Sequence, residues 1–132
     1  VDRVVVLHGG AFIAEGDPYV EHLQQTIAAV EAITGVVGRL CYQSRSGPVE
    51  WLGPALPEVI EEVANQGGRN MLVVPISFVS DHVETLYEID IQYRRLAEAL
   101  GLRFAVTRAL NADPQFIAGL RSLVLQAVGA EL

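Results

Sequence analysis

Apolar residues recur along the chain in two alternating spacings, which predict strands and helices in turn. Continuous or β-branched apolar runs, as in strands buried on both faces of a sheet, cover residues 3–8, 36–43, 71–79 and 103–108. Apolar residues at every third or fourth position, as on one face of a helix, follow over residues 17–35, 51–68, 81–100 and 111–128. Pro75 would remove a ladder hydrogen bond, so we expect the third strand to end near it.

The segments between these elements carry capping signals. Asp17 and Asp113 each precede a proline, as an N-cap residue does before the first helical position, and Gly35 closes the first helical pattern. The repeated order of strand and helix implies right-handed crossovers and a parallel sheet covered by helices on both sides. We therefore expect an α/β fold, a three-layer sandwich with a four-stranded parallel sheet flanked by helices, of flavodoxin-like type and formed as a single domain by residues 1–132.

Composition excludes several classes of protein. The chain has 132 residues, of which 51% are hydrophobic and 19% charged, and this excludes intrinsic disorder. Its net charge is −7, with nine Lys and Arg residues and no basic run, so we expect no nucleic-acid partner. Cys41 is the single cysteine, which rules out an iron–sulfur cluster held by this chain's own thiolates and fits a reducing cytoplasm. The apolar runs are too short for a transmembrane segment, and the start at Val1 suggests a processed or excised segment.

Candidate ligand-binding residues follow the first and third predicted strands. His8 ends the first strand, and Asp81, His82 and Glu84 come after the third. Ligands of open parallel sheets bind outside the carboxyl ends of the strands. A sheet order of the flavodoxin type makes strands one and three neighbours, so we expect these two segments to share one crevice.

The predicted helix over residues 81–100 separates acidic from apolar side chains. At 100° per residue, Glu84 and Glu88 lie one turn apart on a polar face. The opposite face is apolar and is expected to reach the core through Leu86, Ile89, Tyr93, Leu96 and Leu100. Two like charges at this spacing disfavour a helix by only about 0.2–0.5 kcal/mol, so the acidic stripe alone does not establish a function.

Structural roles compete with functional ones for these residues. Asp81 and Glu84 fit an acidic capping box, in which case His82 is a polar residue of the first turn. His8 could be hydrogen-bonded to backbone in a glycine-rich turn. The pair Gly9–Gly10 could form an anion-binding turn, but it lacks both a GxGxxG pattern and a P-loop lysine.

Four segments of the chain carry distinctive motifs: GDPY at residues 16–19, YQSRSGPVEWLGP at residues 42–54, PISFVSDHVETLYEID at residues 75–90 and LNADPQFIAGL at residues 110–120. In this order they resemble the ferrochelatases, the enzymes that insert ferrous iron into porphyrins to make haem. The segment at residues 75–90 is similar to that family's most characteristic stretch, and the segment at residues 42–54 to its second motif. The resemblance covers nearly the whole chain and corresponds to the C-terminal half of the usual enzyme.

The resemblance implies a lyase of haem biosynthesis, with a porphyrin and a divalent metal, Fe2+, as substrates and with no tightly bound cofactor. The family's proposed metal ligand and proton acceptor maps onto His8, and Glu84 faces the same centre. Glu88 continues a ladder of acidic residues that would conduct the cation inward and protons outward. Substrate contacts would come from the neighbouring residues Gly9, Gly10, Phe12, Ser80 and His82.

Three features depart from the family pattern. HGGAF at residues 8–12 replaces the family's His followed by Gly or Ser and Leu-Pro, and Gln92 is neutral where a third acidic residue is usual. The sequence lacks the N-terminal half that would form the opposite wall of the cleft, so we expect a homodimer through an apolar patch around residues 11–13. The alternatives are an isolated or engineered half domain that binds metal or porphyrin weakly without turnover, and a small homodimeric chelatase that uses cobalt or nickel.

Overall fold

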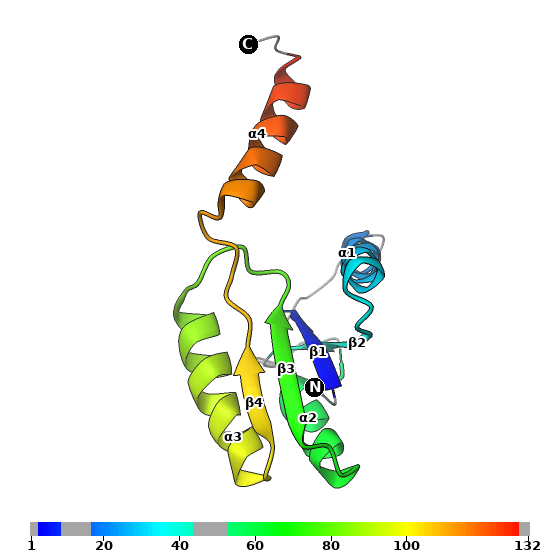
Figure 1. Cartoon of the computed structure of the whole chain (residues 1–132), viewed down its shortest axis with the longest axis vertical. Coiled ribbons are helices and arrows are strands. Elements are labelled where there is room, and N and C mark those ends of the chain that lie inside the picture. Colours follow the sequence, from blue (N-terminus) through cyan, green and yellow to red (C-terminus); the bar gives the residue numbers. More distant parts are fainter. Residues whose placement is uncertain (1–2, 9–16, 44–52, 130–132) are drawn as a thin grey trace.

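The computed structural model describes residues 3–8, 17–43 and 53–129, in which strands and helices alternate (Figure 1). The strands are β1 (Arg3–His8), β2 (Gly38–Tyr42), β3 (Asn70–Pro75) and β4 (Arg103–Val106). The helices are α1 (Tyr19–Thr34), α2 (Leu56–Asn65), the π-helix η1 (Glu84–Tyr93), α3 (Arg94–Ala99) and α4 (Pro114–Val128). None of the helices in these ranges is both long enough and apolar enough to cross a membrane.

The four strands form one parallel sheet in the order β2-β1-β3-β4. β1 lies inside the sheet, where Val5 pairs with Arg39 of β2 on one side and with Val73 of β3 on the other. β4 pairs with the outer side of β3. The predicted α/β fold with neighbouring first and third strands is therefore confirmed. All four strands end along the same side of the sheet, which we call the carboxyl edge.

Local sequence signals account for several element boundaries. β1 has the predicted bounds, and β3 ends at Pro75, which cannot donate to a ladder. The Asp113 carboxylate accepts hydrogen bonds from the backbone N–H groups of Gln115 and Phe116, as predicted for an N-cap. α1 ends at Gly35, whose φ of 69° is a left-handed conformation that glycine adopts without strain.

One face of the sheet carries the hydrophobic core. Side chains alternate along β3, so Met71 and Val73 belong to the core, while Leu72 and Val74 line the opposite face. The core is a single cluster that consists of Cys41, Leu56, Val59, Ile60, Val63, Met71, Val73, Ile89, Ala97, Leu102 and Phe104. The four predicted apolar positions of α2 all belong to it, so this helix and the η1–α3 helix cover the same face.

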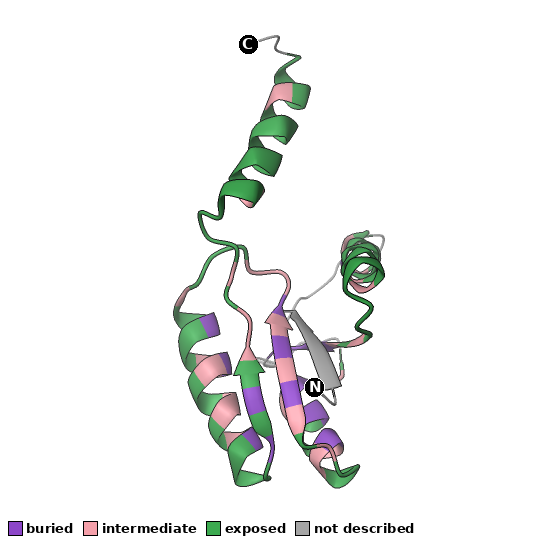
Figure 2. Cartoon of the chain, in the orientation of Figure 1, coloured by how far each residue is buried: buried purple, intermediate pink, exposed green. Residues whose placement is uncertain are grey.

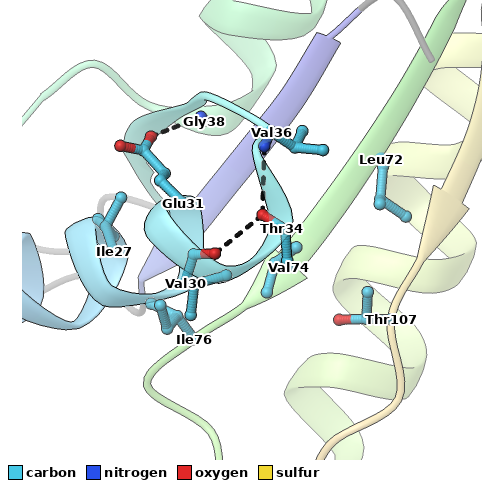
Figure 3. Close-up of a pocket in the computed structure, with 10 residues that line it drawn as sticks. All are labelled: Ile27, Val30, Glu31, Thr34, Val36, Gly38, Leu72, Val74, Ile76 and Thr107. Carbon is cyan, nitrogen blue, oxygen red and sulfur yellow. Dashed lines mark hydrogen bonds between the residues drawn. The ribbon is translucent and has the colours of Figure 1, made fainter.

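Among the described residues, α1 covers the other face of the sheet, and it does so only in part. Of the apolar residues of this helix, Leu23 is buried, but Ile27 is half-buried and Val30 is 45% exposed. A cavity of about 320 Å³ lies between α1 and the sheet (Figure 3). We call this surface the open face, and define it by the cavity-lining side chains of Ile27, Val30, Leu72, Val74 and Ile76.

α4 does not complete this second layer. It extends beyond the carboxyl edge, away from the sheet, and only Phe116 and Leu125 among its residues are even half-buried (Figure 1, Figure 2). The expected three-layer sandwich is therefore formed in part, because one face has a full layer of helices and α1 is the one described helix on the other. Hydrogen bonds hold the loop that follows β4 against the segment that follows β3, and they direct α4 outward.

Truncating a core residue should destabilise the fold far more than truncating an exposed residue of the same type. Ile60 of α2 is 0% exposed, whereas Ile33 of α1 is 87% exposed. We expect Ile60→Ala to lower the free energy of unfolding by about 2–5 kcal/mol, because burial is lost and a cavity remains. Ile33→Ala should change it by less than about 0.5 kcal/mol. Urea denaturation measures both values, and equal losses would contradict a core centred on the α2 side of the sheet.

Candidate functional site

The carboxyl edge brings the predicted site segments together. His8, the last residue of β1, pairs with Tyr42, the last residue of β2. On the other side of β1, Leu7 pairs with Pro75, where β3 ends and the loop to η1 begins. The backbone of His8 thus lies between the ends of two neighbouring strands. The predicted substrate contacts and dimer patch that follow it lie outside the described residues, namely Gly9, Gly10, Ala11, Phe12 and Ile13.

The helix that follows β3 differs from the predicted α-helix over residues 81–100. Glu84–Tyr93 is a π-helix, which is closed by i→i+5 hydrogen bonds, and α-helix follows in Arg94–Ala99. A π-turn holds more residues than an α-turn, so each residue advances by less than the assumed 100°. The inward positions are accordingly four residues apart, at Thr85, Ile89, Tyr93 and Ala97. Leu86 and Leu100 were predicted to face the core and are instead 52% and 44% exposed.

The side chain of Glu88 links η1 to the end of β2 and is not part of a stripe that faces solvent. Its Oε1 accepts a hydrogen bond from the Tyr93 hydroxyl at 3.0 Å, and its Oε2 accepts one from Nε2 of Gln43 at 3.0 Å. Tyr93 is five residues further along the chain, a spacing that a π-helix brings into line. Burial, together with the Glu88 carboxylate, raises the pKa of Tyr93 well above its usual range, so the phenol keeps its proton and remains the donor.

Gln43 is a site residue that sequence reasoning missed. It follows β2 directly, is only 2% exposed, and holds Glu88 through its amide. A carboxylate only accepts hydrogen bonds, so the amide nitrogen must face Glu88 and the amide oxygen must point elsewhere. That Oε1 is buried and has no hydrogen-bond partner among the described residues, which leaves it available to a donor such as a water molecule. Its place just past the end of a strand is the signal that could have identified it.

The predicted capping box of Asp81 and Glu84 is not formed. The first turn is closed by Thr85, whose hydroxyl accepts from the His82 N–H at 3.0 Å and donates to the His82 carbonyl at 3.0 Å. Glu84 is exposed, and its N–H donates to Nδ1 of His82 at 3.3 Å. The His82 ring lies edge-on to Phe78, with the ring centroids 4.5 Å apart. The Glu84 carboxylate therefore stands at the start of η1 without acting as its cap.

Asp81 joins the loop before η1 to the loop after β4. Its carboxylate accepts hydrogen bonds from Nδ2 of Asn111 at 2.9 Å and from the N–H of Ala109 at 3.3 Å. In return, the Asp81 N–H donates to Oδ1 of Asn111 at 3.0 Å. Asn111 has a φ of 49°, a left-handed conformation that asparagine tolerates better than most residues. We call these contacts the Asp81–Asn111 clamp, and the Asn111 side chain is the main cause of the lowered pKa of Asp81.

The described part of the site offers oxygen ligands but no complete metal centre. Within the described ranges, no three His, Cys, Asp or Glu side chains gather closely enough to hold a metal ion. Cys41 is not a candidate ligand, because burial raises the pKa of its thiol to about 12. Glu84 is exposed and Glu88 is half-buried, so each has a carboxylate that a cation could approach. Ser80, a predicted substrate contact, is exposed in the loop before them.

Comparisons with known proteins point to one family. The family model described as Ferrochelatase matches residues 3–128. The chain is 60% identical over 117 residues to a ferrochelatase of Desulfotalea psychrophila and 54% identical over 115 residues to one of Synechococcus sp. strain JA-3-3Ab. The first match covers 89% of this chain and 37% of the relative, and the second covers 83% and 33%. The matches thus span about a third of the length of these curated relatives.

A solved structure shares the fold. The crystal structure of a putative cobalamin (vitamin B12) biosynthesis CbiX protein from Marinobacter aquaeolei VT8 matches with a TM-score of 0.64, over 96% of this chain and 98% of that one. The two sequences are 16% identical, so this likeness concerns the fold alone. An α/β unit of this size therefore makes up nearly all of that solved chain.

The Asp81–Asn111 clamp should be visible in the titration of Asp81. Hydrogen bonds from Asn111, and next from Ala109, lower the pKa of this carboxyl. A group whose pKa is lowered by folding adds stability above its ordinary pKa of about 3.9, and that stability is lost as the pH falls through the lower folded value. We expect NMR titration to show a lowered pKa in the wild type and an upward shift in Asn111→Gly, which keeps the left-handed turn. Identical titrations would contradict the clamp.

The hydrogen bond from Tyr93 to Glu88 should contribute to stability. Tyr93→Phe removes a donor from a charged acceptor, an interaction that typically contributes about 1.5–3 kcal/mol. Glu88 is half-buried and keeps its bond to Gln43, so we expect a loss near the lower value, about 1.5 kcal/mol. Tyr87 is 53% exposed in the same helix, which makes Tyr87→Phe the matched control. Equal unfolding free energies for the two variants would show that the Tyr93 hydroxyl does not act through Glu88.

Proposed function

The chain belongs to the ferrochelatase family, and we propose that it supplies the metal-insertion surface of a tetrapyrrole chelatase, with ferrous iron and a porphyrin as substrates. One observation carries the proposal. Within the segment that matches the family, the acidic helix η1 contacts the end of β2 through Glu88 and Gln43, directly beside the strand end that carries His8. In open parallel sheets, ligands bind outside this edge.

We assign the metal-insertion centre to His8 and Glu84. Insertion exchanges one divalent cation for the two pyrrole N–H protons of the porphyrin, so the site needs both metal ligands and bases. An imidazole and a carboxylate serve both purposes, since ferrous iron accepts either ligand and each group can take up a proton. The support in this structure is positional: His8 ends β1 at the carboxyl edge, and Glu84 is exposed at the start of η1.

Glu88 is the next residue in this proposed path. It is half-buried, and its two oxygens are held by a phenol and by an amide, so its orientation is fixed before any ligand arrives. A carboxylate in such a place can pass a cation to Glu84, toward the porphyrin, and can take up protons from Glu84 and pass them away from the porphyrin. The free Oε1 of Gln43 adds an acceptor that suits a metal-bound water molecule. Gln92, one step further, is exposed and neutral, so the proposed acidic path consists of Glu84 and Glu88.

The tetrapyrrole is proposed to lie against the carboxyl edge, with Ser80 and His82 among its contacts. A porphyrin is broad, flat and largely apolar, and binding sites for such ligands usually cover both faces of the ligand. A single copy of this domain offers one wall. We therefore propose that the active form is a homodimer, in which a second copy supplies the other wall.

A metalation assay tests the proposed centre. The full chain is incubated without oxygen with ferrous iron and a water-soluble porphyrin, and metalloporphyrin is followed by absorbance against a protein-free control. We expect the protein to accelerate insertion, and Glu84→Gln or His8→Ala to slow it at least tenfold, which corresponds to about 1.4 kcal/mol. Glu61→Gln is the matched control, because Glu61 is an exposed glutamate of α2. Melting temperatures of the variants should stay close to that of the wild type.

The other outcomes are equally informative. Porphyrin binding, seen by fluorescence, without any acceleration of insertion would favour a half domain that binds without turnover. Faster insertion of cobalt or nickel than of iron would keep the centre but replace the proposed metal. Equal rates for Glu84→Gln and Glu61→Gln would remove Glu84 from the mechanism.

A further inference from the structure

α4 has an apolar surface that no described residue outside the helix buries. At 100° per residue, its large apolar side chains other than Leu125 fall within an arc of roughly 140°, which is the width of a core-facing helix. The most exposed of them are Ile117, Leu120, Leu123, Val124 and Val128, with exposures between 42% and 63%. Ser122 and Gln126 lie on the opposite side of the helix. α4 is therefore an amphipathic helix displayed without a partner (Figure 2).

The same chain has a second exposed apolar surface, the open face, against which an apolar helix could pack. The open face presents apolar side chains of β3 and α1 around a cavity of about 320 Å³ (Figure 3). α1 covers only part of this face of the sheet, so a second helix beside α1 would complete the layer. Glu31 borders the cavity, and Arg121 borders the apolar arc of α4, where no acidic residue occurs. An α4 helix that lay on the open face would thus add charge complementarity to apolar burial.

The hydrogen bonds of the loop before α4 direct the helix away from the open face of its own chain. The Thr107 N–H donates to the carbonyl of Val73 at 3.0 Å, and the Asn111 N–H donates to the carbonyl of Val79 at 2.8 Å. The Asp81–Asn111 clamp adds side-chain hydrogen bonds at 2.9 and 3.0 Å to the same loop. These contacts lead the chain along the end of β3 and past the carboxyl edge, and α4 then starts at its Asp113 cap, pointing away from the sheet (Figure 1).

We infer that α4 is exchanged between two copies of this chain, each helix packing on the open face of the other copy. Such an exchange is self-complementary and closes with two-fold symmetry, so both unpartnered surfaces are covered at once. A 15-residue helix is about 22 Å long, and reciprocal exchange doubles the surface that it buries. Because α4 leaves from the carboxyl edge, the exchange sets the two carboxyl edges toward each other. The facing carboxyl edges would provide the second wall of the porphyrin site, so their role rests on the proposed function. The exchange of α4 does not rest on it.

Association in solution tests the exchange without metal or porphyrin. Sedimentation of the wild-type chain should show a dimer, and Val124→Glu should weaken dimerisation at least tenfold by placing a charge in the apolar arc. Gln126→Glu places the same charge on the polar side of α4 and should leave dimerisation unchanged. Neither variant touches the core, so their circular dichroism should match the wild type. A wild type that stays monomeric at several hundred micromolar, or two variants that dimerise equally, would overturn the proposal.

Disulfide trapping identifies where α4 docks. A Val124→Cys chain is mixed with a Val30→Cys chain, since Val30 lines the open face; native Cys41 is 0% exposed and stays unreactive. We expect disulfide-linked heterodimers, and far fewer when Ser122→Cys replaces Val124→Cys. At high protein concentration, a chain that carries both Val30→Cys and Val124→Cys should also form disulfides between copies. Rapid closure within one chain, with a monomeric product, would show that α4 folds back and would overturn the exchange while leaving the metal-insertion proposal untouched.

Discussion

The burial of one sheet face against α2 and the η1–α3 helix is the constraint on which the rest of the structure depends. A strand inside a parallel sheet is apolar on both faces, and β3 follows this rule with Met71 and Val73 on one side and Leu72 and Val74 on the other. Of these two sides, the described part of the chain fully encloses only the first. The folded state is therefore anchored by one dense cluster, and the described residues leave part of the second apolar face uncovered. The sheet thus has apolar residues on both faces, but only one of the two faces is fully covered by helices of the described part of the chain.

The candidate site lies at the rim of that enclosed core. β2 becomes fully buried toward its carboxyl end, and Gln43 continues this burial past the last strand residue. A polar side chain in such a place needs partners, and Glu88 supplies one. Low exposure strengthens the hydrogen bonds of Glu88, because water competes less for them. The core thus holds a carboxylate in position, and that carboxylate links the end of β2 to the helix that starts with Glu84.

The π-helix is what makes this arrangement possible. Residues spaced by four drift by about 40° per step around an α-helix, so the side chains of Thr85, Ile89, Tyr93 and Ala97 would spread over about 120°. The wider turn reduces this drift, so the four side chains stay within a narrower arc, and all four face the core or its margin. The same geometry keeps the acidic positions Glu84 and Glu88 on one adjoining side of the helix. The unusual helix therefore serves the packing of its apolar side and the alignment of its acidic side together.

Local patterns predicted much of the fold, and long-range contacts explain what they missed. The bounds of β1, the buried face of α2 and the Asp113 cap each depend on neighbouring residues, which is why spacing sufficed. Asp81 looked like a helix cap because its neighbours fit one, yet its partner Asn111 lies 30 residues away. Gln43 and Glu88 are separated by 45 residues, and nothing in the spacing of either segment reports their contact. The apolar spacing of α4 correctly indicated a helix, but none of its residues is buried, and a pattern does not say against which surface an apolar side packs.

Asp81 connects the two parts of the molecule that are proposed to bind partners, namely the carboxyl edge and the segment that carries α4. It precedes Glu84 by three residues in the loop that begins η1, and its carboxylate holds the loop that leads to α4. A displacement of residues 109–111 relative to the sheet must therefore either break these hydrogen bonds or move the loop that carries Ser80, His82 and Glu84. Breaking them exposes no buried group, since Asp81 and Asn111 are both at the surface, so the cost is limited to the hydrogen bonds themselves. The loop that leads to α4 and the loop that begins η1 are consequently joined through a contact that is specific in geometry and weak enough to be reversible.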